Sequence, residues 1–179
     1  MSSITWVTCG HCDGAGTVTG LLDEPYTCGE CGGHQVRPAD DCQGVAWFYR
    51  PRGEWGQERI AVLMRDLEHP DRWRVTFYDK SGPASHWVER ADRIMNELRG
   101  FRQAAGAARL LDDWSRRPEW ARGMQAATLN AYYSLFSFSG RLDLAQEINS
   151  IAYSVSFQAA IRRGEALRRA HLPGVAVFG

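Results

Sequence analysis

Hydrophobic and polar positions change their spacing twice along the chain, and these changes divide it into three regions. Residues 1–42 are rich in Gly and Cys, with short extended pieces and no sustained period. Residues 43–90 hold short apolar runs broken by turn residues, a pattern typical of antiparallel strands. Residues 91–179 carry apolar positions three and four residues apart, which predicts helices. We therefore expect an α+β protein with three modules, over 1–42, 43–90 and 91–179.

The middle region predicts a small curled antiparallel sheet. Runs at 45–49 and 59–64 are β-branched, aromatic or aliphatic, and residues 73–78 alternate between apolar and polar positions. A turn at 79–83 leads to a last short strand at 85–88. So many short strands in so few residues favour a small sheet or barrel. Residues 44–94 loosely resemble SH3-like and Tudor-like barrels, and this resemblance implies a fold without assigning any binding residue.

Three helices are predicted after the sheet. The first covers about 91–114 and is weakened at Gly100 and Gly106. Pro118 opens the second helix, and Gly140 ends it. The third carries an apolar stripe over residues 144–159, formed by Leu144, Ile148, Ile151, Ala152, Val155 and Ala159. Such a stripe is typical of a core face, and it also predicts possible self-association through the 144–159 helix.

Four of the five cysteines have the spacing of a metal site. Cys9 and Cys12 form one C-x-x-C pair, and Cys28 and Cys31 form a second pair after fifteen intervening residues. Each C-x-x-C turn directs two sulfurs at one tetrahedral ion, so two such turns complete its ligand set. Because no ligand position stays open for water or substrate, we expect one structural Zn²⁺. Cys42 is expected to be a small structural residue.

The two cysteine pairs also carry a family resemblance. Residues 9–16 follow the pattern C-x-x-C-x-G-x-G, and residues 28–35 follow it except that Gln35 replaces the last glycine. This unit resembles the cysteine-rich domain of DnaJ-type chaperones, over residues 9–35 only. The resemblance implies a zinc hairpin of two facing knuckles. Those chaperones carry four such units and two zinc ions, whereas this chain has one pair of units.

Two short motifs suggest other functions. The tripeptide at 69–71, His-Pro-Asp, is the one that J-domains use to stimulate an ATPase, but here it precedes a predicted strand and is explained by a turn. The tetrapeptide at 9–12 is identical to the active site of disulfide isomerases. That chemistry needs a helix beginning at the first cysteine, and residues 13–16 are a poor helix start. His11 and His34 are expected to be solvated loop side chains.

Charge is balanced overall but unevenly distributed. Lys plus Arg and Asp plus Glu each number 21, and Lys80 is the only lysine. Residues 1–44 carry six acids against one arginine, a net charge of −5, and residues 91–179 carry twelve arginines against eight acids. A four-thiolate zinc site adds about −2, so the first module should repel a phosphate backbone. The arginine bias is typical of a GC-rich genome and suggests a bacterial or phage accessory protein.

The motifs of common enzymes are absent from the sequence. It has no phosphate-binding G-x-x-x-x-G-K-[ST], no H-E-x-x-H and no G-x-S-x-G, so we expect no enzymatic activity. There is no export signal and no apolar run long enough to span a membrane. A cytoplasmic protein without membrane contact is therefore expected.

Two kinds of binding partner are compatible with the sequence. We expect a zinc-stapled adaptor or regulatory protein that acts by protein–protein interaction, with Trp55 exposed in a glycine-flanked loop. The alternative is nucleic-acid binding through a basic C-terminal helix that carries Arg162, Arg163, Arg168 and Arg169. The two arginine pairs lie about 120° apart around that helix, and cations also stabilise helix C-termini.

Overall fold

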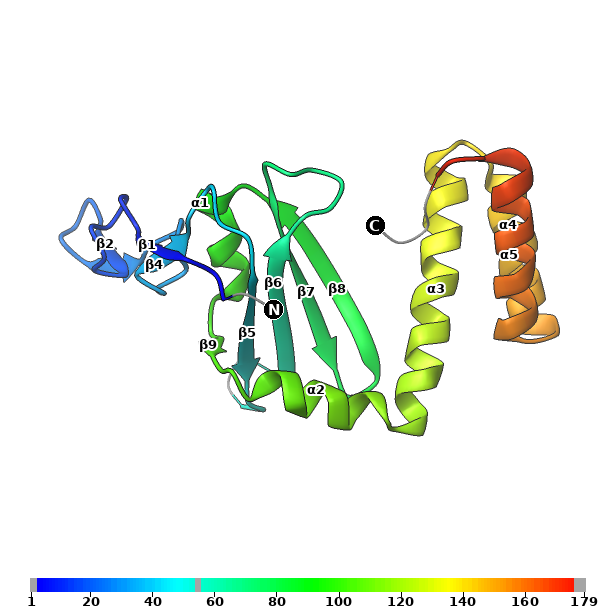
Figure 1. Cartoon of the computed structure of the whole chain (residues 1–179), viewed down its shortest axis with the longest axis horizontal. Helices are drawn as coiled ribbons and strands as arrows, with labels where there is room; N and C mark the ends of the chain where they lie inside the picture. Colours follow the sequence, from blue (N-terminus) through cyan, green and yellow to red (C-terminus); the bar gives the residue numbers. More distant parts are fainter. Residues whose placement is uncertain (1–2, 54–55, 176–179) are drawn as a thin grey trace. The chain divides into compact units, whose positions relative to one another are not determined.

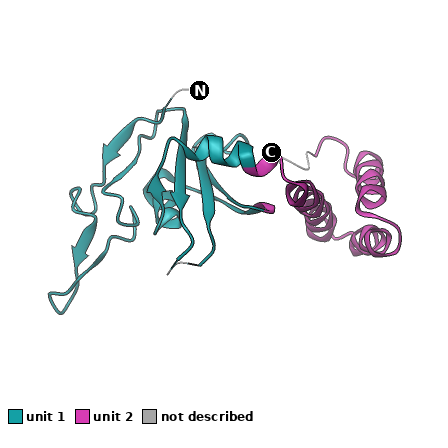
Figure 2. Cartoon of the chain, turned by 90° about the horizontal axis from the view of Figure 1, so that it is seen from below, with its two compact units in different colours: residues 1–80, 84–113 teal, residues 81–83, 114–179 magenta. Residues whose placement is uncertain are grey.

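The computed structural model describes residues 3–53 and 56–175, and it shows an α+β protein (Figure 1). Contacts divide the chain into two compact units (Figure 2). The first comprises Met1–Lys80 and Ala84–Asp113, and the second comprises Ser81–Pro83 and Trp114–Gly179. The first unit holds the cysteines and the sheet, and the second holds three packed helices. The fold class predicted from the sequence is confirmed.

The cysteine module (residues 3–42) consists of two small antiparallel pairs of strands. Strand β1 (Trp6–Thr8) pairs with β4 (Val36–Pro38), and β2 (Thr17–Thr19) pairs with β3 (Pro25–Thr27). These strands have only three residues each, so backbone pairing alone is a weak source of stability. The turns that follow β1 and β3 carry the cysteines.

A five-stranded antiparallel sheet forms the centre of the first unit. Its strands are β5 (Val45–Arg50), β6 (Arg59–Arg65), β7 (Trp73–Asp79), β8 (Gly82–Glu89) and β9 (Arg102–Gln103), in the spatial order β8-β7-β6-β5-β9. The strands predicted from apolar runs and alternation at 45–49, 59–64 and 73–78 are confirmed. Phe48 lies opposite Ala61, and Ala61 lies opposite Phe77, so alternate positions share one buried face.

The core of this unit lies between the sheet and the segment that follows β8. Helix α1 (Ala91–Ile94) and the 3₁₀ helix η1 (Met95–Leu98) cover the buried face of the sheet, and Ile4 adds a side chain from the cysteine module. The core residues are Ile4, Ala46, Phe48, Ala61, Leu63, Trp73, Val75, Phe77, Ala91, Ile94, Met95, Leu98 and Phe101. The cysteine module therefore shares its core with the sheet.

The prediction of one continuous helix over residues 91–114 is wrong. The segment instead forms α1, η1, the short strand β9 and then α2 (Ala107–Ser115). The helical path ends at Arg99, whose ψ is 131°, and Gly100 follows with a φ of 79°. Residues 102–103 then pair with β5, with Gln103 opposite Phe48. Pairing with a sheet edge outweighs the local helical preference of these residues.

The turn between β6 and β7 contains the His-Pro-Asp tripeptide and is built on one buried carboxylate. Asp66 accepts hydrogen bonds from the backbone N–H groups of Glu68 (3.1 Å) and His69 (2.8 Å). His69 Nδ1 lies 3.0 Å from the same oxygen, and Arg74 Nε donates to the other oxygen at 2.7 Å. The turn expected at 69–71 is present, and it connects two strands rather than two helices.

The second unit contains three packed helices: α3 (Pro118–Phe138), α4 (Leu142–Ser154) and α5 (Phe157–His171). Pro118 stands in the first turn of α3, as predicted. Gly140 has a φ of 72°, and the N–H of Arg141 reaches back to the carbonyl of Phe136 at 2.8 Å. The buried side chains are Leu129, Tyr132, Phe136, Leu144, Ala145, Ile148, Ala160 and Leu167.

The prediction of one continuous helix over residues 144–159 is also wrong. Helix α4 ends at Ser154, and Ser156 caps α5 by accepting a hydrogen bond from the N–H of Ala159 at 3.1 Å. Leu144 and Ile148 lie in the core between the helices, whereas Val155 is 71% exposed. Much of the predicted stripe is thus buried internally, and self-association through it stays a prediction. Among the described residues, no helix is long and apolar enough to cross a membrane.

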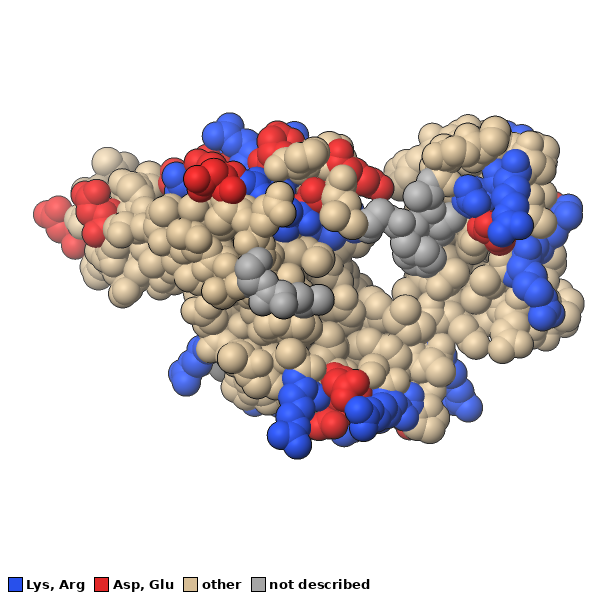
Figure 3. Space-filling view, in the orientation of Figure 1, with Lys and Arg blue, Asp and Glu red and all other residues tan. Residues whose placement is uncertain are grey.

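Charged side chains are distributed differently in the two units. On the face shown in Figure 3, acidic side chains mark the far end of the cysteine module, and arginines lie over α5 of the second unit. This agrees with the negative net charge counted for the first 44 residues.

Candidate metal centre

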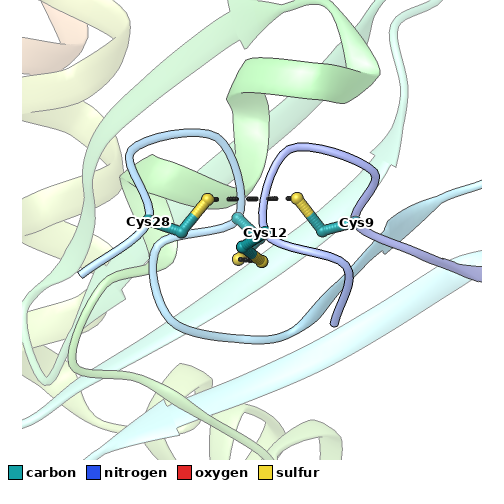
Figure 4. Close-up of side chains that lie close together, drawn as sticks. Cys9, Cys12 and Cys28 are labelled. Carbon is teal, nitrogen blue, oxygen red and sulfur yellow. Dashed lines mark hydrogen bonds between the residues drawn. The ribbon is translucent and has the colours of Figure 1, made fainter. Parts of the chain in front are cut away.

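Two loops bring the four predicted ligands together. Cys9 and Cys12 lie in the turn after β1, and Cys28 and Cys31 lie in the turn after β3. Figure 4 shows the labelled thiols of Cys9, Cys12 and Cys28 pointing into the space between these loops. One backbone hydrogen bond fixes the start of each turn. The Cys9 N–H donates to the Gln35 carbonyl and the Cys28 N–H donates to the Gly16 carbonyl, both at 3.0 Å.

The sulfur positions fit one tetrahedral ion. The Sγ atoms of Cys9 and Cys28 are 4.0 Å apart, those of Cys12 and Cys31 are 3.7 Å apart, and all four lie within 4.8 Å of one another. A zinc ion with Zn–S bonds of about 2.3 Å places its tetrahedral sulfurs about 3.8 Å apart. The four cysteines are therefore placed to bind a single metal ion, as a zinc knuckle does.

Burial makes these thiols costly to ionise without a cation. Cys9, Cys28 and Cys31 are fully buried and Cys12 is nearly so. Burial raises the pKa of Cys31 to about 12 and also raises the pKa of Cys9. Burial acts in the same direction on Cys12, but the Gly16 N–H donates to its sulfur at 3.3 Å and neighbouring thiols donate as well, which lowers its pKa to about 7. A bound dication would supply the charge that stabilises all four thiolates.

The same local structure disfavours the disulfide-exchange interpretation of residues 9–12. The backbone after Cys9 forms a turn, so the first thiol does not stand at the start of a helix of its own segment. The short sulfur distances link the two loops, from Cys9 to Cys28 and from Cys12 to Cys31. Cys42 stands apart from the cluster and donates to the Ala39 carbonyl at 3.2 Å, which agrees with a structural role.

The two histidines near the cysteines have different roles. His11 is exposed, and its Nδ1 lies 3.4 Å from a Glu30 carboxylate oxygen on the facing loop. His34 is half-buried: its Nε2 lies 2.8 Å from the Leu98 carbonyl, and its ring meets the edge of Phe48 with centroids 5.7 Å apart. The expectation of a solvated loop side chain is therefore wrong for His34. This residue connects the cysteine module to η1 and the sheet.

The tip of the β2–β3 hairpin carries two exposed leucines that the sequence analysis missed. Leu21 is fully exposed and Leu22 is 84% exposed, and Tyr26 on β3 is also exposed. The tip is closed by the Gly20 N–H, which donates to the Glu24 carbonyl at 3.0 Å. Figure 1 shows this hairpin at the end of the module away from the sheet. The signal was present in the sequence, because two adjacent leucines precede an acidic turn and have no apolar periodicity around them.

Three of the four basic residues predicted for nucleic-acid contact form ion pairs with two acids. Arg163 pairs with Glu147 at 2.6 Å, and Arg168 and Arg169 both pair with Glu165, at 2.8 and 2.7 Å. Within the part of the chain that the structure describes, only Arg162 of the four predicted residues has no ion pair. Trp55, the residue proposed for protein contact, lies outside the described residues.

Comparison with known proteins adds no relative. No protein-family model matches the chain, and neither the curated proteins nor the solved structures contain a match. The four-cysteine centre is therefore supported by its own geometry.

Proposed function

We propose that this protein is a non-enzymatic adaptor that binds another protein through the tip of its zinc-stapled β2–β3 hairpin. The observation that carries this proposal is the exposure of Leu21 and Leu22 at the outer end of the β2–β3 hairpin. Complete burial of two leucine side chains contributes about 3–6 kcal/mol, which is a large share of a micromolar binding energy. An apolar tip on a rigid base provides that contact with little ordering cost.

The charge around the tip indicates the chemistry of the partner. Asp23 and Glu24 follow the leucines directly, and the first 44 residues have a net charge of −5. An apolar pocket bordered by Lys or Arg side chains would accept the leucines and pair with these acids. A phosphate backbone would be repelled by the same charges.

The metal has a structural role in this proposal. One Zn²⁺ held by Cys9, Cys12, Cys28 and Cys31 would join the two loops at the base of the hairpin, where β2 and β3 have three residues each. The DnaJ-type resemblance supports this arrangement of two facing knuckles. The SH3-like resemblance of the sheet is supported by its strand order, in which a 3₁₀ helix precedes a last strand that pairs with the first.

A capture experiment with matched leucine variants tests the tip. The tagged, zinc-loaded protein is incubated with bacterial lysate, with and without nuclease, and compared with Leu21→Ser/Leu22→Ser and with Leu67→Ser. Leu67 is a suitable control because it is 79% exposed on the β6–β7 turn of the same unit. The proposal is supported if one discrete protein is captured after nuclease treatment, is captured equally by Leu67→Ser, and is captured in at least tenfold lower amount by the tip variant.

Two results would contradict it. Equal capture by the tip variant would exclude the leucines as the contact. Loss of all partners on nuclease treatment would favour the nucleic-acid alternative. That alternative is second because three of its four arginines are already paired with acids. It predicts a steep salt dependence and loss of binding when Arg162, Arg163, Arg168 and Arg169 are all replaced by Ala.

A further inference from the structure

Two arginines face each other at one end of the sheet. Arg50 is the last residue of β5, Arg59 is the first residue of β6, and the two are cross-strand partners. The adjacent ends of β5 and β6 lie at the lower edge of the sheet in Figure 1. Directly opposed like charges destabilise a pair of strands, so this arrangement needs a compensating interaction.

Neither arginine finds that compensation within the described part of the chain. No ion pair there joins Arg50 or Arg59 to an acid, and the Nε atoms of both are buried without a hydrogen-bond partner. A buried donor left without an acceptor has lost its hydrogen bonds to water and gained none in return, which destabilises the fold. Two other arginines of the sheet differ: Arg74 donates to Asp66 at 2.7 Å, and Arg65 donates to the Cys42 carbonyl at 3.1 Å.

The acid next to Arg59 in the sequence is engaged elsewhere. Glu58 precedes Arg59, but one of its oxygens accepts from the Tyr49 hydroxyl at 2.6 Å and the other lies 2.6 Å from Lys80 Nζ. Burial, together with the charge of Arg59, lowers the pKa of Arg50, which agrees with two cations held close to each other.

The Arg50 side chain is held in place by an aromatic ring. Its guanidinium carbon lies 4.7 Å from the centroid of Phe101, which is itself buried against Phe77. A guanidinium stacked on a ring still directs its in-plane N–H donors toward an acceptor at its edge, and because Nε is buried, a ligand would meet the terminal NH₂ groups. The site therefore combines an ordered cation, a second cation opposite it and donors that lack an acceptor.

We propose that Arg50 and Arg59 together bind one small oxyanion of the phosphate-monoester class. Such a dianion carries enough charge to neutralise both guanidiniums, and its oxygens can accept from both forks. This binding site is separate from the leucine tip, so it goes beyond the proposed protein-binding function. Its test does not depend on the identity of a protein partner.

The direct test follows the arginine N–H groups during a titration. The zinc-loaded full chain, labelled with ¹⁵N, is titrated with inorganic phosphate at constant ionic strength, and the Nε–H signals of Arg50, Arg59 and Arg102 are followed. Arg102 is the internal control because it lies exposed on the neighbouring strand β9. The Arg50 and Arg59 signals should shift together and saturate, and the Arg102 signal should not.

Ligand and variant series define the specificity. Titration with glycerol phosphate tests binding of a monoester, and titration with inorganic phosphate tests binding of the free ion. Saturable binding of either ligand supports the site. Dimethyl phosphate carries one charge and represents a nucleic-acid diester, so it should bind at least tenfold more weakly. Arg50→Gln and Arg59→Gln should each weaken phosphate binding at least tenfold, and Arg102→Gln should leave it unchanged.

The outcomes decide the proposal even if a variant does not fold, because the wild-type titration alone reports on both arginines. Three results would overturn it: signal shifts that rise linearly with phosphate without saturating, the same shifts on adding chloride, or an equal shift of the Arg102 signal. An unresponsive wild type would also overturn it, since a carboxylate of the chain would then already neutralise the pair. Phosphate should also raise the unfolding temperature of the wild type, and this rise should disappear in Arg59→Gln.

Discussion

Asp66 shows how one buried residue organises a turn and makes stability depend on pH. Its oxygens accept from two backbone N–H groups and from Arg74. Burial acts to raise the pKa of this carboxyl group, but the donors, led by Arg74, outweigh burial and lower the pKa to about 2. A carboxylate whose pKa falls on folding stabilises the protein above its unfolded pKa, and this contribution is lost as pH falls through the folded pKa.

Replacing this carboxylate should therefore change the acid response of the protein. At pH 6 we expect Asp66→Asn to be about 2 kcal/mol less stable than the wild type, and the difference should shrink between about pH 4 and pH 2. Urea unfolding of both proteins across this range measures it. Thiolate protonation at the cysteines affects both proteins alike, so the difference isolates Asp66. A difference that is constant with pH would refute this account.

Gly32 should be intolerant of a side chain for a reason that its neighbour Gly29 does not share. Gly32 has a φ of 59°, and an added Cβ would lie 2.6 Å from the Met95 carbonyl oxygen of η1. Gly29 has nothing within 4 Å of the same position. Gly32→Ala should cost about 2 kcal/mol of unfolding free energy, and Gly29→Ala should change it little. Equal effects in thermal unfolding would mean that the contact with η1 does not limit this site.

At the scale of elements, the sequence predicts what depends on local pattern and misses what depends on distant partners. The strands at 45–49, 59–64 and 73–78 were predictable because alternation or an apolar run marks each of them. The segment 91–114 was not, since pairing of residues 102–103 with β5 decides its path. The metal ligands could be read from their spacing. The opposed arginines depend on strand register, which spacing does not encode. The leucine tip leaves only a weak signal, two adjacent leucines without apolar periodicity around them, and its exposure depends on how the hairpin closes.

Packing between α3 and α5 depends on the absence of a side chain at Gly164. An added Cβ there would lie 2.8 Å from Cγ of Tyr132, and the Tyr132 hydroxyl is held by Glu165 at 2.8 Å. Alanine gains about 1 kcal/mol of helix propensity, but overpacking a core costs about 1–3 kcal/mol. We therefore expect Gly164→Ala to lower the free energy of unfolding, measured with urea. In a Tyr132→Leu background the same change should cost less or stabilise, and an unchanged cost would argue against the ring contact.

At the scale of the whole molecule, the cysteine module and the sheet belong to one compact unit and share a core. Ile4 lies in the core of the sheet, and His34 contacts both Leu98 and Phe48. The helices α3, α4 and α5 have a separate core formed by their own side chains. Loss of the metal should therefore affect the sheet through these contacts and leave the three-helix core intact.

Metal removal tests this coupling. The purified protein should contain one zinc ion per chain, and chelation should abolish the dispersed amide signals of residues 3–42 and shift those of Phe48 and Leu98. Signals of core residues in α3–α5 should keep their positions, because their packing does not involve the cysteine module. Cys28→Ser should reproduce the chelated state, whereas Cys42→Ser should retain the metal, since Cys42 stands outside the four-sulfur cluster. Zinc content by elemental analysis and amide spectra provide the readout. If chelation left the Phe48 and Leu98 signals unchanged, the His34 contact would not transmit the metal's stabilisation to the sheet.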